Sequence, residues 1–277
     1  MRLAYLGPPG TFTEEALLSC PEADGAELVP MTTVPDVIAA VEAKDVDAGV
    51  VPIENSIEGS VNITLDTLAF EAENVTIRRE IVLPIRHALL AKQGVAMESI
   101  VAVVSHPHAT GQCRKFLISN VPNAEIRAAN STAEAARIVA ERGPIEPWAA
   151  IGTELAASLY GLVVLAPDIE DRRENSTRFV LVGREGPAPT GKDKTSVVCF
   201  IAKDRPGALL SILHEFSDRG INLTKLQSRP TKERLGEYCF FIDIEGHADE
   251  DEVRHALASL RTKILDVKVM GSYPRAG

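Results

Sequence analysis

The sequence predicts an α/β protein in two parts, a larger one over residues 1–183 and a smaller one over residues 195–277. Short apolar runs alternate with helical patterns through the first part, which is typical of α/β sheets. Residues 184–194 are rich in Gly, Pro and charge and lack an apolar face, so they are expected to form a linker. After them the pattern restarts as strand, helix, strand, strand, helix, strand, the order of ferredoxin-like domains.

The elements of the larger part follow from its apolar runs and their flanking residues. Thr33 can cap the second helix, where Pro35 suits the first turn. Helices are expected at Thr13–Cys20, Val34–Ala43, Gly111–Leu117, Thr132–Ala140 and Glu154–Tyr160. Strands are expected at Leu3–Leu6, Ala48–Ile53, Ile81–Ala91, Ile100–Ser105, Ala149–Ile151, Val163–Ala166 and Arg178–Val182, in largely parallel sheets.

The smaller part has a clear helix end, because Gly220 follows the helical pattern directly. Its helices are expected at Gly207–Arg219 and Asp249–Leu260. Its strands are expected at Thr195–Ala202, Asn222–Pro230, Glu237–Glu245 and Ile264–Tyr273.

Composition excludes several classes of protein. A hydrophobic fraction of 45% and a charged fraction of 25% are typical of ordered globular chains. A net charge of -10 argues against nucleic acid or an anionic membrane as the partner. The four cysteines form no Cys-x-x-Cys pair, which predicts free thiols and no zinc site. With no secretion signal or membrane span in the sequence, we expect a cytoplasmic protein.

Four polar loops follow predicted strands, and ligands of α/β proteins bind beyond the carboxyl ends of strands. Residues 7–14 offer backbone N–H groups near Thr11 to an anion, although Thr11 and Glu14 also make a capping box. Residues 54–60 contribute Asn55, Ser56 and Ser60 as hydrogen-bond donors, or form a merely solvated loop.

The other two loops carry a histidine pair and an arginine. His106, in residues 105–112, is a candidate anion donor or acid, or a residue that orients the turn before Pro107. In residues 174–179, Arg178 is a candidate carboxylate clamp beside Asn175, or pairs with a nearby acid. With no nucleotide fingerprint or metal cluster in the sequence, the four loops predict a cofactor-free anion-binding cleft between two α/β lobes.

Taken together, these segments resemble the prephenate dehydratase family, and the C-terminal part resembles an ACT regulatory domain. The N-terminal matches are YLGPPGTFTEEA (5–16), VVPIENSIEGSV (50–61), SHPHATGQCRKFL (105–117), NSTAEAA (130–136), AAIGTELAASLYGL (149–162) and NSTRFVLVG (175–183). The C-terminal matches are RPGALLSIL (205–213), GINLTKLQSRP (220–230) and GEYCFFIDIEGH (236–247). The sequence departs from the family where His108 replaces the usual Gln and where Gln227 replaces the usual Glu.

The resemblance implies a catalytic domain like the type 2 periplasmic binding proteins. One lobe would comprise about residues 1–78 and 168–183, and the other about 79–167. The implied reaction converts prephenate to phenylpyruvate, water and carbon dioxide, a carbon–oxygen lyase step of phenylalanine biosynthesis. Since no chorismate mutase segment precedes Met1, we expect a monofunctional enzyme.

The resemblance also implies roles for residues of the catalytic part. Arg178 would clamp a side-chain carboxylate of prephenate, with amides near Thr11 and the donors Asn55 and Ser56 sharing the charge. Thr177 would stand at the leaving hydroxyl and donate a hydrogen bond, or relay a proton from water or His106. Asn175 and Ser60 complete the polar set, and Phe179 would keep the scissile carboxylate poorly hydrated.

The C-terminal domain would bind L-phenylalanine between two copies of the chain, which makes the protein a homodimer or homotetramer. The small residues Gly207 and Ala208 would let the amino acid approach the backbone. The expected effector site comprises Gly207, Ala208, Leu209, Leu210, Asn222, Leu223, Gln227, Ser228 and Arg229.

Three alternatives stay open. A solute-binding protein would share the two-lobed fold but would not carry the C-terminal domain. A transcription regulator would need a basic DNA-reading helix, which this acidic sequence does not offer. An enzyme of the same class could act on arogenate, in which an amino group replaces the keto group of prephenate.

Overall fold

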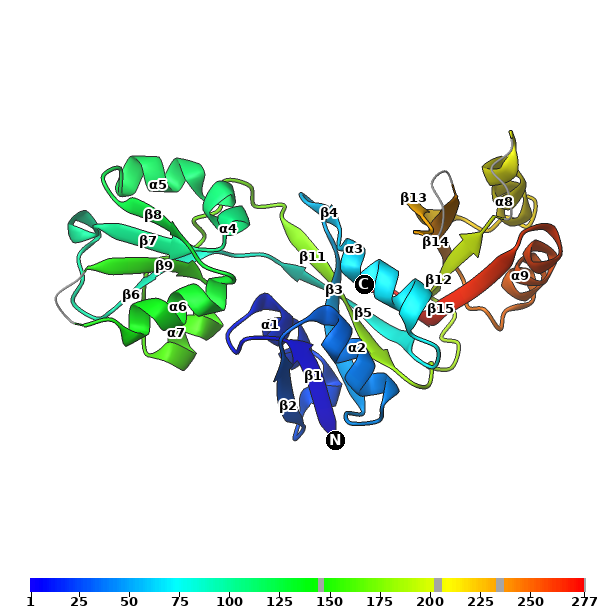
Figure 1. Ribbon diagram of the computed structural model, residues 1–277, viewed down its shortest axis with the longest axis horizontal. Coiled ribbons are helices and arrows are strands. Elements are labelled where there is room, and N and C mark those ends of the chain that lie inside the picture. Colours follow the sequence, from blue (N-terminus) through cyan, green and yellow to red (C-terminus); the bar gives the residue numbers. More distant parts are fainter. Residues whose placement is uncertain (144–146, 202–205, 233–236, 277) are drawn as a thin grey trace. The chain divides into compact units, whose positions relative to one another are not determined.

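Three sheets carry the fold of the computed structural model, which describes residues 1–143, 147–201, 206–232 and 237–276 (Figure 1). The first sheet has the order β2-β1-β3-β11-β5, and β4 pairs with β3. Its strands are β1 (Arg2–Leu6), β2 (Glu27–Met31), β3 (Ala48–Asn55), β4 (Gly59–Ser60), β5 (Thr76–Pro84) and β11 (Ser176–Gly183). The adjoining helices are α1 (Phe12–Leu18), α2 (Val34–Glu42) and α3 (Asn62–Asp66), which continues into a π-helical turn, η2 (Thr67–Glu71).

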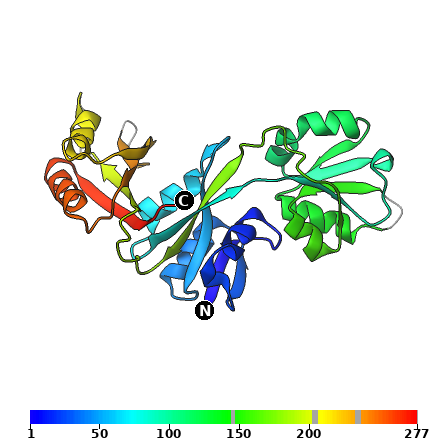
Figure 2. The ribbon, with the colours of Figure 1, turned by 180° about the vertical axis from the view of Figure 1, so that it is seen from behind.

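The second sheet is sandwiched between two pairs of helices and has the order β10-β6-β9-β7-β8. Its strands are β6 (Ala88–Ala91), β7 (Ala102–Ser105), β8 (Glu125–Ala128), β9 (Trp148–Gly152) and β10 (Val163–Ala166). The helices α6 (Thr132–Glu141) and α7 (Glu154–Tyr160) cover one face, and α4 (Pro107–Gln112) and α5 (Arg114–Asn120) cover the other (Figure 2). Alternation along the strands divides the core, because Leu90 and Val104 pack beneath α6 and α7 whereas Leu89 and Val103 pack beneath α4 and α5.

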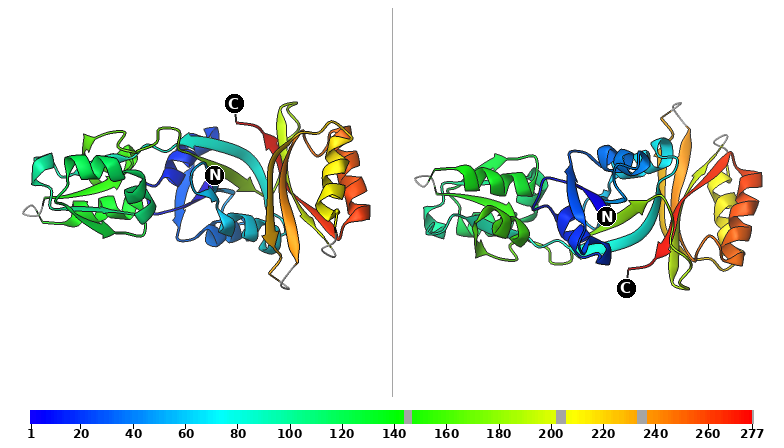
Figure 3. Two further views of the ribbon diagram at one scale, coloured as in Figure 1. Left: turned by 90° about the horizontal axis from the view of Figure 1, so that it is seen from above. Right: turned by 90° about the horizontal axis from the view of Figure 1, so that it is seen from below.

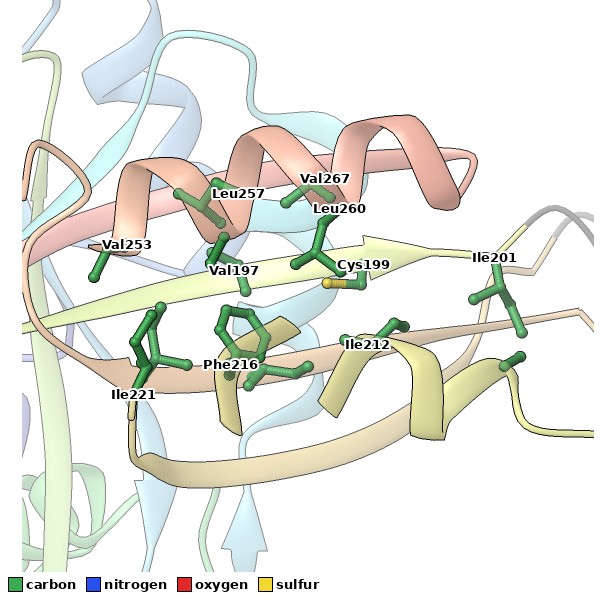
Figure 4. Close-up of a cluster of buried hydrophobic side chains, with 14 residues drawn as sticks. Val197, Cys199, Ile201, Ile212, Phe216, Ile221, Val253, Leu257, Leu260 and Val267 are labelled. Carbon is green, nitrogen blue, oxygen red and sulfur yellow. The ribbon is translucent and has the colours of Figure 1, made fainter. Parts of the chain in front are cut away.

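The third sheet is antiparallel, with the order β13-β14-β12-β15. Its strands are β12 (Asp193–Phe200), β13 (Leu223–Pro230), β14 (Tyr238–Glu245) and β15 (Asp266–Pro274). The helices α8 (Ala208–Ser217) and α9 (Asp251–Lys263) lie side by side on one face (Figure 3). Between them and the sheet, Val197, Phe216 and Leu257 are among the buried side chains of a single apolar cluster (Figure 4). The ferredoxin-like prediction is therefore confirmed for this part of the chain.

The α/β class is confirmed, but three expectations about strands are wrong. The run Ile81–Ala91 is not one strand, because β5 ends at Pro84 and β6 begins at Ala88 in another sheet. The sheets are mixed, since β6 runs antiparallel to both of its neighbours. The strands β2 and β8 were not expected, because β2 contains Pro30 and β8 is an exposed edge strand without a continuous apolar run. Ala202, the expected end of β12, lies outside the described residues.

The described chain forms two compact units. The first comprises Met1–Val37, Val50–Asn62 and Val82–Phe179, and the second comprises Ile38–Gly49, Ile63–Ile81 and Val180–Gly277. Within the second unit, residues 63–81 pack on the sheet face that α8 and α9 leave uncovered. The buried Lys194 ammonium lies 2.7 Å from the Glu80 carboxylate, and Thr76 donates to the carbonyl of Met270 across 3.1 Å.

Three further features concern the class of protein. All four cysteines lie in the described part of the chain, where they are buried and form no disulfide. Among the described residues, no helix is long and apolar enough to cross a membrane. The same residues contain no group of three or more His, Cys, Asp or Glu side chains arranged to hold a metal ion.

A close backbone contact in the second unit gives a stability test. A Cβ at Gly271 would lie 2.4 Å from the carbonyl oxygen of Ile77, so Gly271→Ala forces β15 away from β5. We expect a loss of about 1–3 kcal/mol in the free energy of unfolding, measured with urea. Gly186→Ala is the control, because its added Cβ has no atom of the other described residues within 4 Å, apart from those of its chain neighbours. Equal stability of the two variants would contradict this packing.

Candidate active site

The first unit contains a cavity of about 510 Å³, a volume typical of small-molecule sites. The starts of α1 and α6, the turn between β3 and β4, helix α4 and strand β11 surround it. Its lining residues are Thr11, Phe12, Thr13, Pro52, Asn55, Glu58, Gly59, Ser60, Val61, Ile85, His87, His106, His108, Ala109, Gln112, Asn130, Ser131, Thr132, Asn175, Thr177 and Phe179. Seven of the nine residues predicted for the catalytic site are among them.

Thr11 reaches the cavity from the cap of α1. Its hydroxyl accepts from the N–H of Glu14 across 3.4 Å and donates to the carbonyl of Leu6 across 3.1 Å. Thr11 therefore caps α1 and also lines the cavity. The preceding loop is held by α7, because Thr153 donates to the carbonyl of Gly10 across 2.8 Å.

Asn55 connects the end of β3 with the start of β11. Its side-chain oxygen accepts from the N–H groups of Ile57 and Glu58, both at 2.9 Å. Its amide nitrogen therefore faces the start of β11. It donates to the side-chain oxygen of Asn175, which directly precedes this strand, across 2.9 Å and to the Thr177 hydroxyl across 2.8 Å. Three predicted polar residues are thus joined in one hydrogen-bonded group.

Gln112 joins this group from the end of α4. Its side-chain oxygen lies 3.0 Å from the amide nitrogen of Asn175 and 3.1 Å from Nε2 of His87. Its own amide nitrogen donates to the Glu58 carboxylate across 3.3 Å. Sequence reasoning missed His87 and Gln112 as site residues. Gln112 could have been found, because it belongs to the matching stretch 105–117, whereas His87 lies in an apolar run that was expected to form one continuous strand.

Two predicted residues lie outside the cavity lining. Strand alternation turns Arg178 away from the face that carries Thr177 and Phe179. Its guanidinium Nε lies 3.5 Å from the Glu54 carboxylate, which is a nearby acid. Arg178 is therefore not among the residues that line the cavity.

Ser56 is the other predicted residue outside the lining. Its hydroxyl accepts from the N–H of Ser176 across 3.0 Å and donates to the carbonyl of Glu174 across 3.3 Å. It therefore ties the two loops together at an exposed position instead of facing the cavity.

Neutral groups dominate the electrostatics of the cavity. Among the described residues that line it, none is Lys or Arg, and Glu58 is the one carboxylate. Burial lowers the pKa of His87, outweighing its contact with Gln112 and the charge of Glu170. Burial, followed by the neighbouring His108, also lowers the pKa of His106, although Glu58 opposes the shift. An anion here must therefore be bound chiefly by hydroxyls, amides and backbone N–H groups.

The start of α6 supplies backbone donors that the sequence indicated only as a matching stretch. Ser131 caps this helix by accepting from the N–H of Glu134 across 2.9 Å. Asn130, Ser131 and Thr132 all line the cavity, so the positive end of a ten-residue helix faces it. Such an end favours carboxylates and phosphates.

Comparison with known proteins agrees with this geometry. The prephenate dehydratase family model matches residues 3–187, and the ACT domain model matches residues 195–262. The chain belongs to the prephenate dehydratase family. The prephenate dehydratase of Amycolatopsis methanolica is 44% identical over 278 residues, which cover 99% of this chain and 89% of the relative. The bifunctional chorismate mutase/prephenate dehydratase of Aquifex aeolicus is 44% identical over 100% of this chain and 74% of its own.

A solved structure of the family is also similar over the full chain. Prephenate dehydratase from Arthrobacter aurescens, in complex with L-Phe, has a TM-score of 0.93 and 43% sequence identity. The comparison covers 100% of this chain and 90% of the other.

In the ACT domain, the predicted effector residues lie at three places in one chain. Gly207, Ala208, Leu209 and Leu210 surround the start of α8, whereas Asn222 and Leu223 follow its end at the start of β13. Ten helical residues span about 15 Å, so these two groups do not form one site within a chain. Gln227 and Ser228 lie farther along β13 with Arg229, whose guanidinium binds Asp66 through two hydrogen bonds of 2.8 and 2.7 Å.

The lowered pKa of His87 gives a pH test. In the unfolded chain this residue protonates below about pH 6.5, whereas the folded site resists protonation. The free energy of unfolding therefore decreases as the pH falls through this range. Between pH 7.5 and 5.5, the free energy of unfolding measured with urea should decrease less for His87→Gln than for the wild type. Part of the decrease should remain in the variant, because the pKa of His106 is lowered as well. An equal loss in both proteins would contradict the assignment.

Proposed function

We propose that the chain is a prephenate dehydratase that converts prephenate to phenylpyruvate, water and carbon dioxide. The observation that carries this proposal is the Thr177 hydroxyl, which lines a cavity of neutral donors and accepts a hydrogen bond from Asn55. Because Asn55 occupies a lone pair of Thr177, the hydroxyl proton of Thr177 remains to be donated to a ligand.

The reaction requires little from the protein beyond binding, alignment and help for the leaving group. The bond between the ring and its carboxylate breaks and releases carbon dioxide. The electron pair moves into the ring, which becomes aromatic, and the carbon–oxygen bond of the ring hydroxyl breaks. One proton converts the departing hydroxide to water. The ring itself accepts the electrons, so the chemistry needs no electron-sink cofactor.

Thr177 is suited to assist the departure of hydroxide by donating a hydrogen bond. A threonine hydroxyl is too weak an acid to surrender its proton, so the proton must reach the leaving oxygen from another source. His106 is a poor source, since its pKa is lowered and its Nδ1 accepts from the N–H of His108 across 3.3 Å. We therefore favour the bulk solvent as the source of the proton, with water as the relay and neutral His106 as a hydrogen-bond donor through Nε2.

Neutral donors also suit the two carboxylates of the substrate. The start of α6 and the hydroxyls of Thr11, Thr13 and Ser131 surround one side of the cavity, and the rings of Phe12 and Phe179 provide apolar walls. A cation held on the scissile carboxylate would stabilise the bound substrate more than the transition state, in which that charge is leaving. Binding by dipoles avoids this penalty. In this proposal Arg178 supports β3 through Glu54 and does not clamp the substrate.

Substitution of Thr177 tests the proposal. Thr177→Val keeps the branched shape and removes the hydroxyl, so we expect kcat to fall by about 10²–10⁴-fold while KM changes little. Thr177→Ser is the control, because it keeps the hydroxyl and should retain most activity. The measurement is steady-state formation of phenylpyruvate from prephenate. A normal kcat for Thr177→Val would remove Thr177 from the chemistry.

The same assay with arogenate separates the two substrates of this class. An ammonium group on the substrate side chain would need an acceptor, whereas the described lining is rich in donors and carries one carboxylate, Glu58. We therefore propose prephenate as the preferred substrate. Faster turnover of arogenate would contradict this preference.

We further propose that L-phenylalanine inhibits the enzyme by binding between the ACT domains of two copies, in a homodimer or homotetramer. Residues 207–210 and Asn222 lie at opposite ends of α8, which supports a site that a second chain completes. The proposed division is a catalytic part at 1–183, a connection at 184–194 and a regulatory part at 195–277. The lack of a disulfide among the four buried cysteines supports a cytoplasmic location.

The Asp66–Arg229 pair connects the regulatory strand β13 with the catalytic part. Asp66 is the last residue of α3, and this helix directly follows the cavity residues Ser60 and Val61. The Asp66 carboxylate also lies 2.6 Å from the Lys232 ammonium. Burial would raise the pKa of Asp66, but hydrogen bonds from Arg229 and Lys232 outweigh it and lower the pKa. A change in β13 on effector binding would therefore reach the cavity through α3.

Asp66→Asn tests this connection. The substitution removes the charge that holds Arg229, and we expect at least a tenfold rise in the phenylalanine concentration for half-inhibition. The kcat without phenylalanine should change less than twofold. Lys232→Ala is the control, because an exposed partner of the same carboxylate contributes little. Unchanged inhibition in Asp66→Asn would contradict the connection.

A further inference from the structure

His87 is a buried polar residue of the cavity to which the mechanism above gives no role. It lies between β5 and β6, with 3% of its surface exposed. The ring of Phe12 packs against it edge to face, with centroids 5.4 Å apart. Its backbone N–H donates to the Glu170 carboxylate across 3.0 Å. The segment is therefore held firmly, and the orientation of the imidazole is defined.

Glu58 determines which way the Gln112 amide points. An ionised carboxylate only accepts hydrogen bonds, so the Gln112 group that lies 3.3 Å from Glu58 must be its amide nitrogen. The Gln112 oxygen then faces His87 and Asn175. Both of those residues must donate to it.

This orientation fixes the tautomer of His87. The proton must lie on Nε2, which donates to Gln112, so Nδ1 carries none in the neutral ring. Nδ1 is buried, and within the described part of the chain it has no hydrogen-bond partner. Protonation of Nδ1 would bury an unpaired N–H and a charge, which is costly. The site therefore keeps the imidazole neutral.

The remaining links lead to Thr177. Because Asn175 donates its amide to Gln112, its side-chain oxygen is left to accept from Asn55. Asn55 in turn presents its second amide proton to the Thr177 hydroxyl. The orientation of Asn175 therefore follows from Gln112 and agrees with that of Asn55, whose oxygen also accepts from the N–H groups of Ile57 and Glu58.

We propose that His87 is a positioning residue of the dehydration, which acts as a neutral donor and, through Gln112, Asn175 and Asn55, keeps the Thr177 hydroxyl proton directed at the leaving hydroxyl. The proposal rests on the function assigned to Thr177. If His87 acts in this way, kcat should depend on the proton that Nε2 donates. If His87 only packs against its neighbours, kcat should depend on the shape of its ring.

The experiment compares two variants of the full chain. His87→Phe keeps an aromatic ring beside Phe12 and removes the donor, and we expect kcat to fall by about 10–100-fold with KM within threefold. His87→Gln places an amide N–H near the position of Nε2 and should recover kcat to within threefold of the wild type. Urea unfolding identifies any variant that fails to fold.

Two outcomes would overturn the proposal. One is a kcat for folded His87→Phe within twofold of the wild type. The other is an equal decrease in the kcat of His87→Phe and His87→Gln, which would show that the ring, and not the hydrogen-bond donor, is required. A normal kcat for Thr177→Val would instead refute the function on which the proposal rests.

The double variant His87→Phe/Thr177→Val tests whether the two residues act through one series. If they do, His87→Phe should change kcat less than twofold once the Thr177 hydroxyl is absent. If His87→Phe lowers kcat as much in the Thr177→Val variant as in the wild type, His87 does not act through Thr177 and the proposal is contradicted.

Nitrogen NMR of ¹⁵N-histidine-labelled wild type provides a readout that needs no variant to fold. At neutral and mildly basic pH, His87 should be the neutral Nε2–H tautomer. A proton on Nδ1 in that range would overturn the proposal.

Discussion

The fixed polarity of the side-chain amides in the cavity is the constraint on which the rest of this site depends. An amide can turn by 180° and exchange its donor for its acceptor, so a series of amides specifies direction only if it is anchored. Here two anchors act independently, since backbone N–H groups hold the Asn55 oxygen and Glu58 holds the Gln112 nitrogen. With both in place, Thr177 accepts from Asn55, and its hydroxyl proton remains available for a ligand in the cavity.

The same logic accounts for the absence of lysine and arginine from the described lining of the cavity. The scissile carboxylate loses its charge as carbon dioxide forms, so strong attraction to it would oppose the reaction. Oriented dipoles at the start of α6 attract a carboxylate without placing a full charge beside it. The acidic sequence and an anionic substrate are therefore compatible, because binding depends on a few local donors.

The sequence predicted the α/β class, the ferredoxin-like order and most of the polar cavity residues, because strand-to-helix loops carry these residues. It could not predict that the run Ile81–Ala91 leaves one sheet and enters another, since both halves are equally apolar. His87 was missed for the same reason. Arg178 was expected as a clamp because it is adjacent to Thr177, whereas strand alternation places it on the other face, near Glu54. Such distinctions depend on which sheet face a residue occupies, which loop composition does not specify.

The most direct test of the account is a crystal structure of the protein with an unreactive analogue of prephenate. We expect the analogue's ring hydroxyl to lie within about 3 Å of the Thr177 hydroxyl oxygen, the length of an O–H···O bond. Its carboxylates should face the starts of α1 and α6. An analogue bound with its ring hydroxyl away from Thr177, or with a carboxylate on Arg178, would contradict the account.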